Sequence, residues 1–375
     1  MARAGHHSAA VPLAVAYAAL LLYASLYPFE GWRWPPGQTL LALLALPSAI
    51  HQSSFDVWSN LLGYAPLGGL LALAALRGGA RAVPALAVAL LVTLALAYGC
   101  ELLQQFVPGR VPAREDLVMN AAGSLAGAAL AVVAHAMGLV GRWQALRQRW
   151  FAADAAGALA LLALWPVALL FPTPVPLGLG QIGERLREHL SDLLENVPWA
   201  GTAHALLAAP PVNTAPLRPL AEVLIVALGL LAPCLVAYTV VAPGWRRLAM
   251  VLGAVAAGVS GMALSTLLNF GPTHAMAWLS QATLPGLLLG TVLALLTLPL
   301  SQRLTAGIGL MACTGLVVGV AQAGDNPYFA QSLQAWEQGR FVRFHGLAQW
   351  VGWLWPYAAM AYLLGRLAAR PAAGR

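Results

Sequence analysis

Lysine is absent from the sequence, and all 20 basic residues are arginines. This absence excludes a lysine Schiff base and a lysine nucleophile. Charge is scarce in general, at 9% of the 375 residues against about 25% in soluble domains. Cysteine is scarce too. Cys100, Cys234 and Cys313 lie far apart in or beside apolar runs, so they form neither a metal-binding spacing nor a disulfide framework, and we interpret them as small core residues.

Apolar residues are abundant instead, at 60% of the chain with a mean hydropathy of +0.74. A helix needs about 20 apolar residues to cross a bilayer. Ten runs are long enough: 9–27, 57–76, 83–103, 117–139, 155–171, 220–242, 247–268, 282–300, 304–322 and 347–367. The sequence therefore predicts an all-α protein, a polytopic bundle of about ten transmembrane helices. The shorter apolar stretch 38–50 contains Pro47, which favours a re-entrant or interfacial segment.

The arginines indicate how the spans are oriented. When the loops alternate between the two sides with the N-terminus cytoplasmic, the inner side has a single acid, Asp154. The same side has Arg3, Arg77, Arg81, Arg142, Arg147, Arg149, Arg246, Arg247, Arg303, Arg366, Arg370 and Arg375. The positive-inside rule then predicts that both termini are cytoplasmic and that the first helix stays uncleaved. The pI of 9.8 is thus a topology signal, and no nucleic-acid partner is expected because no basic stripe with interleaved aromatics occurs.

Two further patterns concern helix surfaces. The segment 180–197 has apolar residues at helical spacing and a charged opposite face. It is predicted to be a helix that either lies on the outer leaflet or docks on other loops. The glycines of Gly123-x-x-x-Gly127 allow close helix crossing, and we expect that crossing within one chain rather than between two copies.

The polar residues concentrate between Tyr98 and Gly127, where two long apolar runs meet. Asp116, Asn120 and Gly123 repeat the spacing of Asp56, Asn60 and Gly63. Acid, amide and glycine at positions i, i+4 and i+7 share one helical face. Such a face is too costly to expose to lipid, so both faces are expected to point into the bundle.

The second half of the chain echoes the first. The stretch 101–108, ELLQQFVP, aligns without gaps on 265–272, STLLNFGP, which pairs Glu101 with Ser265 and Asp116 with Ser280. Matching spans run in the same direction, so the repeat would be parallel. The predicted domains are a four-helix membrane domain at 9–140, a degenerate second copy without these acids at 155–300, and two additional helices at 304–367.

The first half resembles the VanZ family of membrane proteins, which is named after an accessory of teicoplanin resistance. The resemblance covers about 23–133 and is carried by Asp56 with Asn60, the 66–68 stretch PLG, Glu101 with Gln104 or Gln105, Arg110 or Arg114, and Asp116 with Asn120. It implies a multi-pass protein of the bacterial cytoplasmic (inner) membrane and cell envelope, in some cases linked to antibiotic resistance. It implies no established reaction.

Several roles remain open for the outward-facing cluster. Clustered carboxylates raise one another's pKa, which suits Glu101 and Asp116 to acid–base catalysis on a lipid phosphate or glycan. Binding of an anionic lipid-linked precursor or a glycopeptide-related ligand would use the arginine forks and the amides; the binding set is Asp56, Asn60, Gln104, Gln105, Arg110, Arg114 and Asn120. The cluster could also be a purely structural knot or part of a transporter, and a carboxylate trio could hold a divalent cation. The histidines lack metal spacing and no phosphate loop occurs, so no cofactor or resident metal is predicted.

Overall fold

The computed structural model describes residues 10–27, 29, 31–48, 54–108, 110, 112–195, 197–208, 217–270, 274–323 and 342–369. Within these ranges the regular structure is helical, apart from one isolated antiparallel bridge between Phe151 and Val241. The protein is therefore an all-α helical membrane bundle, as predicted. The chain divides into two compact units, Met1–Leu146 and Arg147–Arg375, and each is described by itself.

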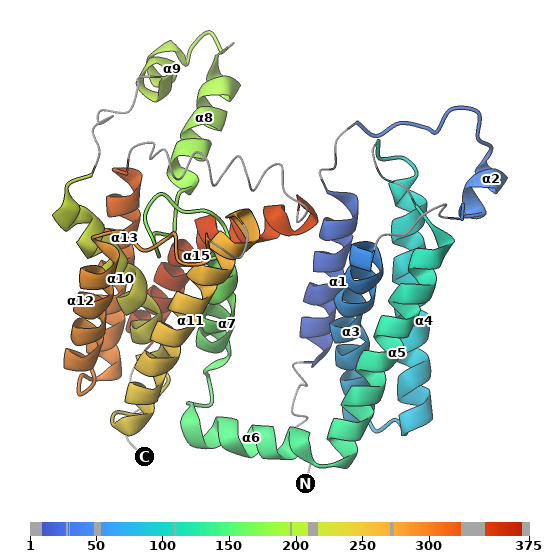
Figure 1. Cartoon of the computed structure of the whole chain (residues 1–375), viewed down its shortest axis with the longest axis horizontal. Coiled ribbons are helices and arrows are strands. Elements are labelled where there is room, and N and C mark those ends of the chain that lie inside the picture. Colours follow the sequence, from blue (N-terminus) through green and yellow to red (C-terminus); the bar gives the residue numbers. More distant parts are fainter. Residues whose placement is uncertain are drawn as a thin grey trace. The chain divides into compact units, whose positions relative to one another are not determined.

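The first unit is built around helix α3 (Figure 1). It contains α1 (Ala10–Leu26), α2 (Leu40–Leu44), α3 (Ser54–Arg77), α4 (Ala82–Gln104) and α5 (Arg114–Ala136), and α6 (Leu139–Trp150) begins in it. Helix α3 packs most extensively on α5 and also contacts α4 and α1. The chain direction places the start of α3, the end of α4 and the start of α5 at the same end of this unit.

Backbone-to-backbone contact joins α3 and α5, as the glycine spacing predicts. A Cβ atom on Gly123 would lie 2.1 Å from the carbonyl oxygen of Leu61, and one on Gly127 would lie 1.8 Å from that of Ala65. Non-bonded carbon atoms settle at about 3.5–4.0 Å, so only glycine fits at these two positions. The contact between helices of one chain is confirmed.

The second unit is built around helix α10. It contains α7 (Ala156–Ala168), α8 (Ile182–Leu194), α9 (Gly201–Ala208), α10 (Pro219–Tyr238), α11 (Trp245–Phe270), α12 (Thr283–Leu296), α13 (Gln302–Ala321) and α15 (Val342–Ala368). Helix α10 contacts α12, α13, α11 and α7, and α15 packs on α13 and α7. From Ile225 onward most of α10 is buried, which explains why this segment is apolar on every face.

Buried Arg247 closes the end of this unit where α10 and α12 terminate. Its side chain is fully buried near the start of α11. The guanidinium donates hydrogen bonds to the carbonyls of Tyr238, Val241, Leu298 and Leu300, and it stands 5.0 Å from the Tyr238 ring centroid. Helix C-terminal carbonyls lack partners within the helix, so one arginine satisfies two helix ends here.

Each of the ten predicted spans contains a helix. Among the described residues, six helices are long and apolar enough to cross a membrane: Asp56–Arg77, Ala82–Gln104, Arg114–Ala136, Pro219–Tyr238, Trp245–Leu268 and Gln302–Ala321. The same residues also contain three shorter apolar helices, Ala10–Leu26, Ala156–Ala168 and Thr283–Leu296. The predicted amphipathic segment forms α8, and the interfacial stretch 38–50 contains the short helix α2. Helices α6 and α9 are not among the predicted elements.

Candidate functional site

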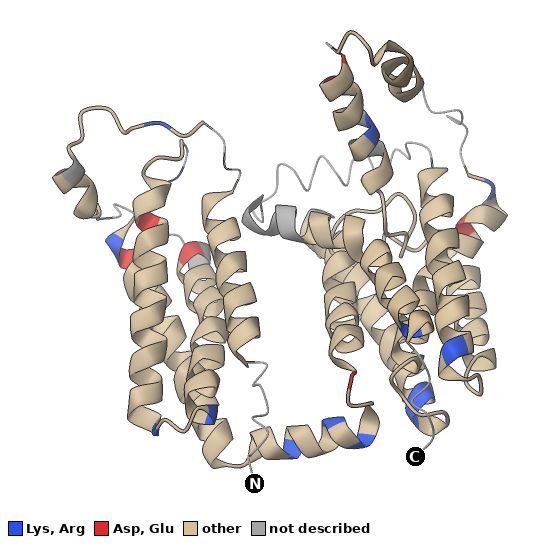
Figure 2. Cartoon of the chain, turned by 180° about the vertical axis from the view of Figure 1, so that it is seen from behind, with Lys and Arg blue, Asp and Glu red and all other residues tan. Residues whose placement is uncertain are grey.

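The structure brings the predicted site residues to one end of the first unit. They come from the start of α3 (Asp56, Asn60), the end of α4 (Glu101, Gln104, Gln105), the following loop (Arg110) and the start of α5 (Arg114, Asp116, Asn120). Figure 2 shows acidic residues, coloured red on the ribbon, at this end of the unit. Arg77 and Arg81 lie at the opposite end, between α3 and α4. We call this group of nine residues the polar cluster.

Glu101 is the buried centre of the polar cluster, with 5% of its surface exposed. Its Oε2 atom accepts a hydrogen bond of 2.9 Å from the backbone N–H of Ala113. Ala113 is the N-cap residue of α5, so the carboxylate ties the end of α4 to the start of α5. A charge-assisted bond of this kind is among the stronger ones in proteins, and it gives Glu101 a positioning role. The catalytic role remains a prediction.

Arg110 and Gln104 tie the same region to the end of α1. The Arg110 guanidinium donates to the carbonyls of Tyr27 and Ala24, and the Gln104 amide donates to the carbonyl of Ser25 at 3.0 Å. These carbonyls lie in the last turn of α1 and directly after it, where intrahelical donors run out and a cation is favoured. Arg110 and Gln104 thus satisfy a helix C-terminus.

A segment outside the predicted site wraps around this end. Residues 31–48 run from the end of α4 to the start of α5, and we call them the strap. The Arg33 N–H donates to the carbonyl of Phe106 at 3.0 Å, and the Gln105 amide donates to that of Leu43 at 2.7 Å. The Tyr98 hydroxyl donates to the carbonyl of Leu44. At the far end of the strap the Arg114 N–H donates to the carbonyl of Pro47 at 3.0 Å.

The strap carries an exposed rim of aromatic and aliphatic side chains. Trp32 is 44% exposed, Trp34 is 52% exposed and Leu41 is 78% exposed. Trp34 also packs edge-on against Phe106, which anchors the strap beside α4. Exposed tryptophans of a membrane protein settle at the level of the lipid headgroups. Their presence in the sequence around Arg33 was the signal that could have added the strap to the predicted site.

Two arginines at the two ends of the strap lie outside the buried bonds of the cluster. Arg33 is exposed, and the side chain of Arg114 is 68% exposed. The Arg114 guanidinium forms an ion pair with Glu115 at 3.4 Å. Exposed pairs of this kind stabilise a protein by about 0–1 kcal/mol, so the pairing restrains Arg114 little.

The two asparagines present buried amide atoms. Asn120 is 2% exposed, and within the described residues its Oδ1 atom has no hydrogen-bond partner; the Nδ2 atom of Asn60 lacks one as well. Buried polar atoms without partners are uncommon, and a bound group or water usually satisfies them. Deeper between the helices, Ser124 and Thr93 satisfy each other at 2.9 Å. The two buried amide atoms without partners therefore lie at the end of the first unit that holds the polar cluster.

Metal ligation finds no support in the described part of the chain, which contains no group of three or more His, Cys, Asp and Glu residues that could hold an ion. Asp56 and Asp116 lie in the first turns of α3 and α5, where a carboxylate is favoured by the helix dipole. The carboxylates are thus placed on helix starts rather than around a common centre.

Comparison with known proteins finds a family match in the first unit. The family model described as VanZ/LLP1 matches residues 12–135, which span α1 to α5. No curated protein and no solved structure matches the chain. Residues 12–135, which contain the whole polar cluster, are therefore similar to the VanZ/LLP1 family.

Proposed function

We propose that the polar end of the first unit binds an anionic lipid-linked precursor of the cell envelope. The observation that carries this proposal is the pair of exposed arginines, Arg33 and Arg114, at the two ends of a strap with exposed tryptophans. Guanidinium groups bind phosphate oxygens through paired N–H donors. The tryptophans hold those donors at the depth where a lipid pyrophosphate lies.

The proposed binding site has the outward orientation that the arginine distribution predicts. A polyprenyl chain would remain in the bilayer beside the apolar face of α2, where Leu41 and Leu44 are exposed, and beside that of α4, where Leu91 is exposed. The headgroup would then reach Arg33 and Arg114 without leaving the interface. The unpaired amide atoms of Asn60 and Asn120 offer further polar contacts at the helix starts.

The acids of the polar end do not cancel the attraction of these arginines. Glu101 is buried and accepts the Ala113 N–H. Asp56 and Asp116 are half-buried in first helical turns, where the positive end of the helix dipole offsets their charge. Glu115 is the acid beside Arg114, and its contact is a weak exposed pair. A phosphate can therefore replace Glu115 at Arg114.

Binding is favoured over catalysis and over transport. Because the Glu101 carboxylate already accepts a backbone N–H, it is less available to act as an acid or base. A transport path along the interface of α3 and α5 would need space, but Gly123 and Gly127 bring the two backbones into contact there. The inner membrane of a bacterium is the proposed location, with both termini cytoplasmic.

Binding of farnesyl pyrophosphate by the purified full-length protein tests the proposal. The dissociation constant is measured by native mass spectrometry for the wild type and for Arg33→Gln with Arg114→Gln together. Loss of two charge-assisted contacts should weaken binding by at least about tenfold. Farnesol, which lacks the pyrophosphate, should bind weakly to both proteins.

Arg142→Gln is the matched control, because Arg142 is an exposed arginine on α6. It should bind the probe as the wild type does. Equal affinity of the double variant and the wild type would refute the proposal, as would equal affinity for farnesol and farnesyl pyrophosphate. Teicoplanin measured in the same way tests the glycopeptide ligand that the family resemblance suggests.

A further inference from the structure

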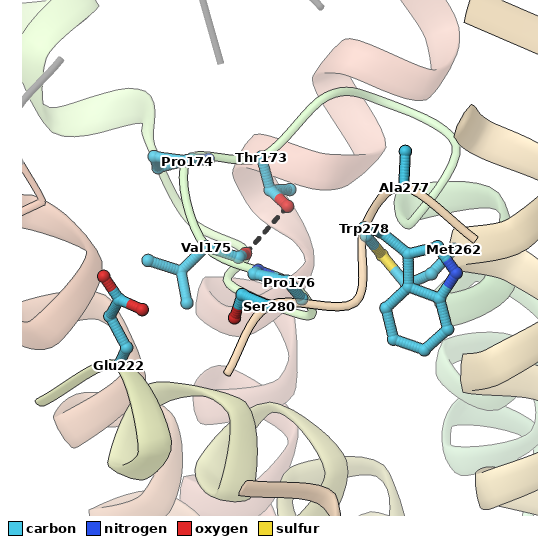
Figure 3. Close-up of a pocket in the computed structure, with 9 residues that line it drawn as sticks. All are labelled: Thr173, Pro174, Val175, Pro176, Glu222, Met262, Ala277, Trp278 and Ser280. Carbon is cyan, nitrogen blue, oxygen red and sulfur yellow. Dashed lines mark hydrogen bonds between the residues drawn. The ribbon is translucent and has the colours of Figure 1, made fainter. Parts of the chain in front are cut away.

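A pocket of about 220 Å³ lies in the second unit, where the loop after α7 meets the start of α10 and the loop before α12. Its walls are largely apolar and include Val175, Pro176 and Met262. Figure 3 shows Glu222 on one side of the pocket and the Trp278 indole on the opposite side, with the indole nitrogen turned away from Glu222. For scale, a dry protein cavity of about 150 Å³ can hold a benzene molecule.

Within the part of the chain that the structure describes, Glu222 is the one charged residue that lines this pocket. It lies in the first turn of α10 and is half-buried. Among the described residues, no side chain forms an ion pair or hydrogen bond with its carboxylate. An unpaired carboxylate beside apolar walls favours a cationic partner, because opposite charges attract more strongly where water is partly excluded.

The hydroxyl groups of the pocket present acceptors. Thr173 donates its hydroxyl proton to the carbonyl of Val175 at 2.8 Å, which leaves its oxygen lone pairs for a donor (Figure 3). Either hydroxyl can be the donor between Ser280 and Thr283; when Thr283 donates to the carbonyl of Trp278, Ser280 donates to Thr283 Oγ1 and keeps its own lone pairs. Glu222, Thr173 and Ser280 therefore match a group with several N–H donors and no acceptor.

The pocket also corresponds in position to the polar cluster of the first unit. Helix α10 contacts α12, α11 and α7, as α3 contacts α5, α4 and α1. The gapless alignment of 265–272 on 101–108, continued along the chain, pairs Ala277 with Ala113 and Ser280 with Asp116. Both Ala277 and Ser280 line the pocket.

Similar hydrogen bonds connect the helices around the pocket and around the polar cluster. Ser265, which aligns with Glu101, donates to the carbonyl of Leu170 just after α7. Its neighbour Thr266 donates to the carbonyl of Ala275 in the loop before α12, at 2.9 Å. In the first unit, Gln104 and Glu101 connect α4 to the corresponding segments. The second copy has serines at the two aligned positions, and its acid at this end is Glu222 in the first turn of α10.

We infer that the second unit is a diverged copy of the VanZ/LLP1 domain whose pocket binds an organic ammonium ion with a small apolar body. The ammonium group donates to Glu222, Thr173 and Ser280, and the apolar body packs between Pro176 and Trp278. A free amine and the amine of a lipid headgroup share this chemistry. The inference does not depend on ligand binding by the first unit.

Thermal unfolding of the full-length protein in detergent tests the assignment, with hexylammonium as the free probe and lysophosphatidylethanolamine as the lipid probe. Ligands that bind the folded state raise the unfolding midpoint in proportion to their occupancy. At least one of the two probes should raise the midpoint, whereas hexanol, hexanoate and lysophosphatidylglycerol should not. A shift with hexylammonium alone assigns a free amine, and a shift with the lipid alone assigns a headgroup.

Glu222→Gln should weaken binding of the active probe by at least tenfold, and Ala277→Leu should weaken it by filling the pocket without changing its charge. Asp192→Asn is the control, because Asp192 is an exposed acid on α8 in the same unit; it should bind as the wild type does.

The inference would be overturned if Glu222→Gln bound the probe with unchanged affinity. This holds even if the variant has a lower unfolding midpoint in the absence of ligand. Equal shifts with hexanol or with Mg²⁺ alone would also overturn it. Arg33→Gln with Arg114→Gln should leave amine binding unchanged, which separates this result from a failure of the first site.

Discussion

Substitution of Gly127 by alanine tests whether the backbone contact of α3 and α5 holds the first unit together. The added Cβ atom would lie 1.8 Å from the carbonyl oxygen of Ala65, 2.6 Å from its carbonyl carbon and 2.9 Å from its Cα atom. All three are backbone atoms, so no side chain can rotate away to relieve the clash. The two helices must separate instead.

The size of the separation sets the expected cost. Non-bonded atoms prefer distances of about 3.5 Å, so the helices must move apart by roughly 1.5 Å near Gly127. Insertion of one methyl group into a tightly packed interior costs about 1–3 kcal/mol, and more where the neighbours are rigid. We therefore expect Gly127→Ala to destabilise the protein by about 3 kcal/mol, at the upper end of that range.

The assay is thermal unfolding of the purified protein, with Gly99→Ala as the matched control. A Cβ atom on Gly99, in the neighbouring helix α4, would meet nothing within 4 Å. That variant should be as stable as the wild type or more stable by up to about 1 kcal/mol, since alanine favours helix. A Gly127→Ala protein as stable as the Gly99→Ala protein would show that α3 and α5 do not touch at this point.

Two more substitutions address buried polar bonds. Glu101→Gln should lower stability by about 1 kcal/mol, because a neutral amide oxygen accepts the Ala113 N–H more weakly than a carboxylate; an unchanged unfolding midpoint would argue against this tie. Arg247→Met should cost about 3 kcal/mol or more, because it leaves the carbonyls of Tyr238 at the end of α10 and of Leu298 just after α12 without this donor. Membrane yield and unfolding midpoint measure the second effect, and Asp154→Asn, which loses a largely exposed partner of Arg366, should change both little.

The helices of this protein were predictable because apolar length is a strong signal in a membrane protein. Each of the ten runs forms a helix, since a lipid-exposed backbone must satisfy its own hydrogen bonds. The contact at Gly123 and Gly127 was also readable, because glycine four residues apart is otherwise a poor choice in a helix. Helix α6 was not predicted, because its sequence is polar and basic and none of its residues is buried.

The candidate site was predictable in its location and less so in its chemistry. Spacing alone placed Asp56, Glu101 and Asp116 at neighbouring helix ends. It did not reveal that Glu101 accepts the Ala113 N–H or that Arg110 donates to the end of α1, since both bonds join segments through loop geometry. These bonds of the strap were not predictable either, because the strap contributes only backbone groups to them: the Arg33 N–H donates to Phe106, and the Leu43 carbonyl accepts from the Gln105 side chain.

Under the proposed equivalence, comparison of the two units separates what the fold requires from what the first unit adds. In the second unit, Ser265 and Thr266 connect α11 to its neighbours with neutral hydroxyl groups. Packing of this kind therefore does not require a charge near the end of α11, or near the end of α4, which corresponds to it. The first unit nevertheless buries the carboxylate of Glu101, which is costly to desolvate. Because packing does not require the charge of Glu101, the residues that this carboxylate positions explain it better. Glu101 positions the start of α5, where Arg114 lies, and Arg114 is one of the two exposed groups that we expect to bind the anion.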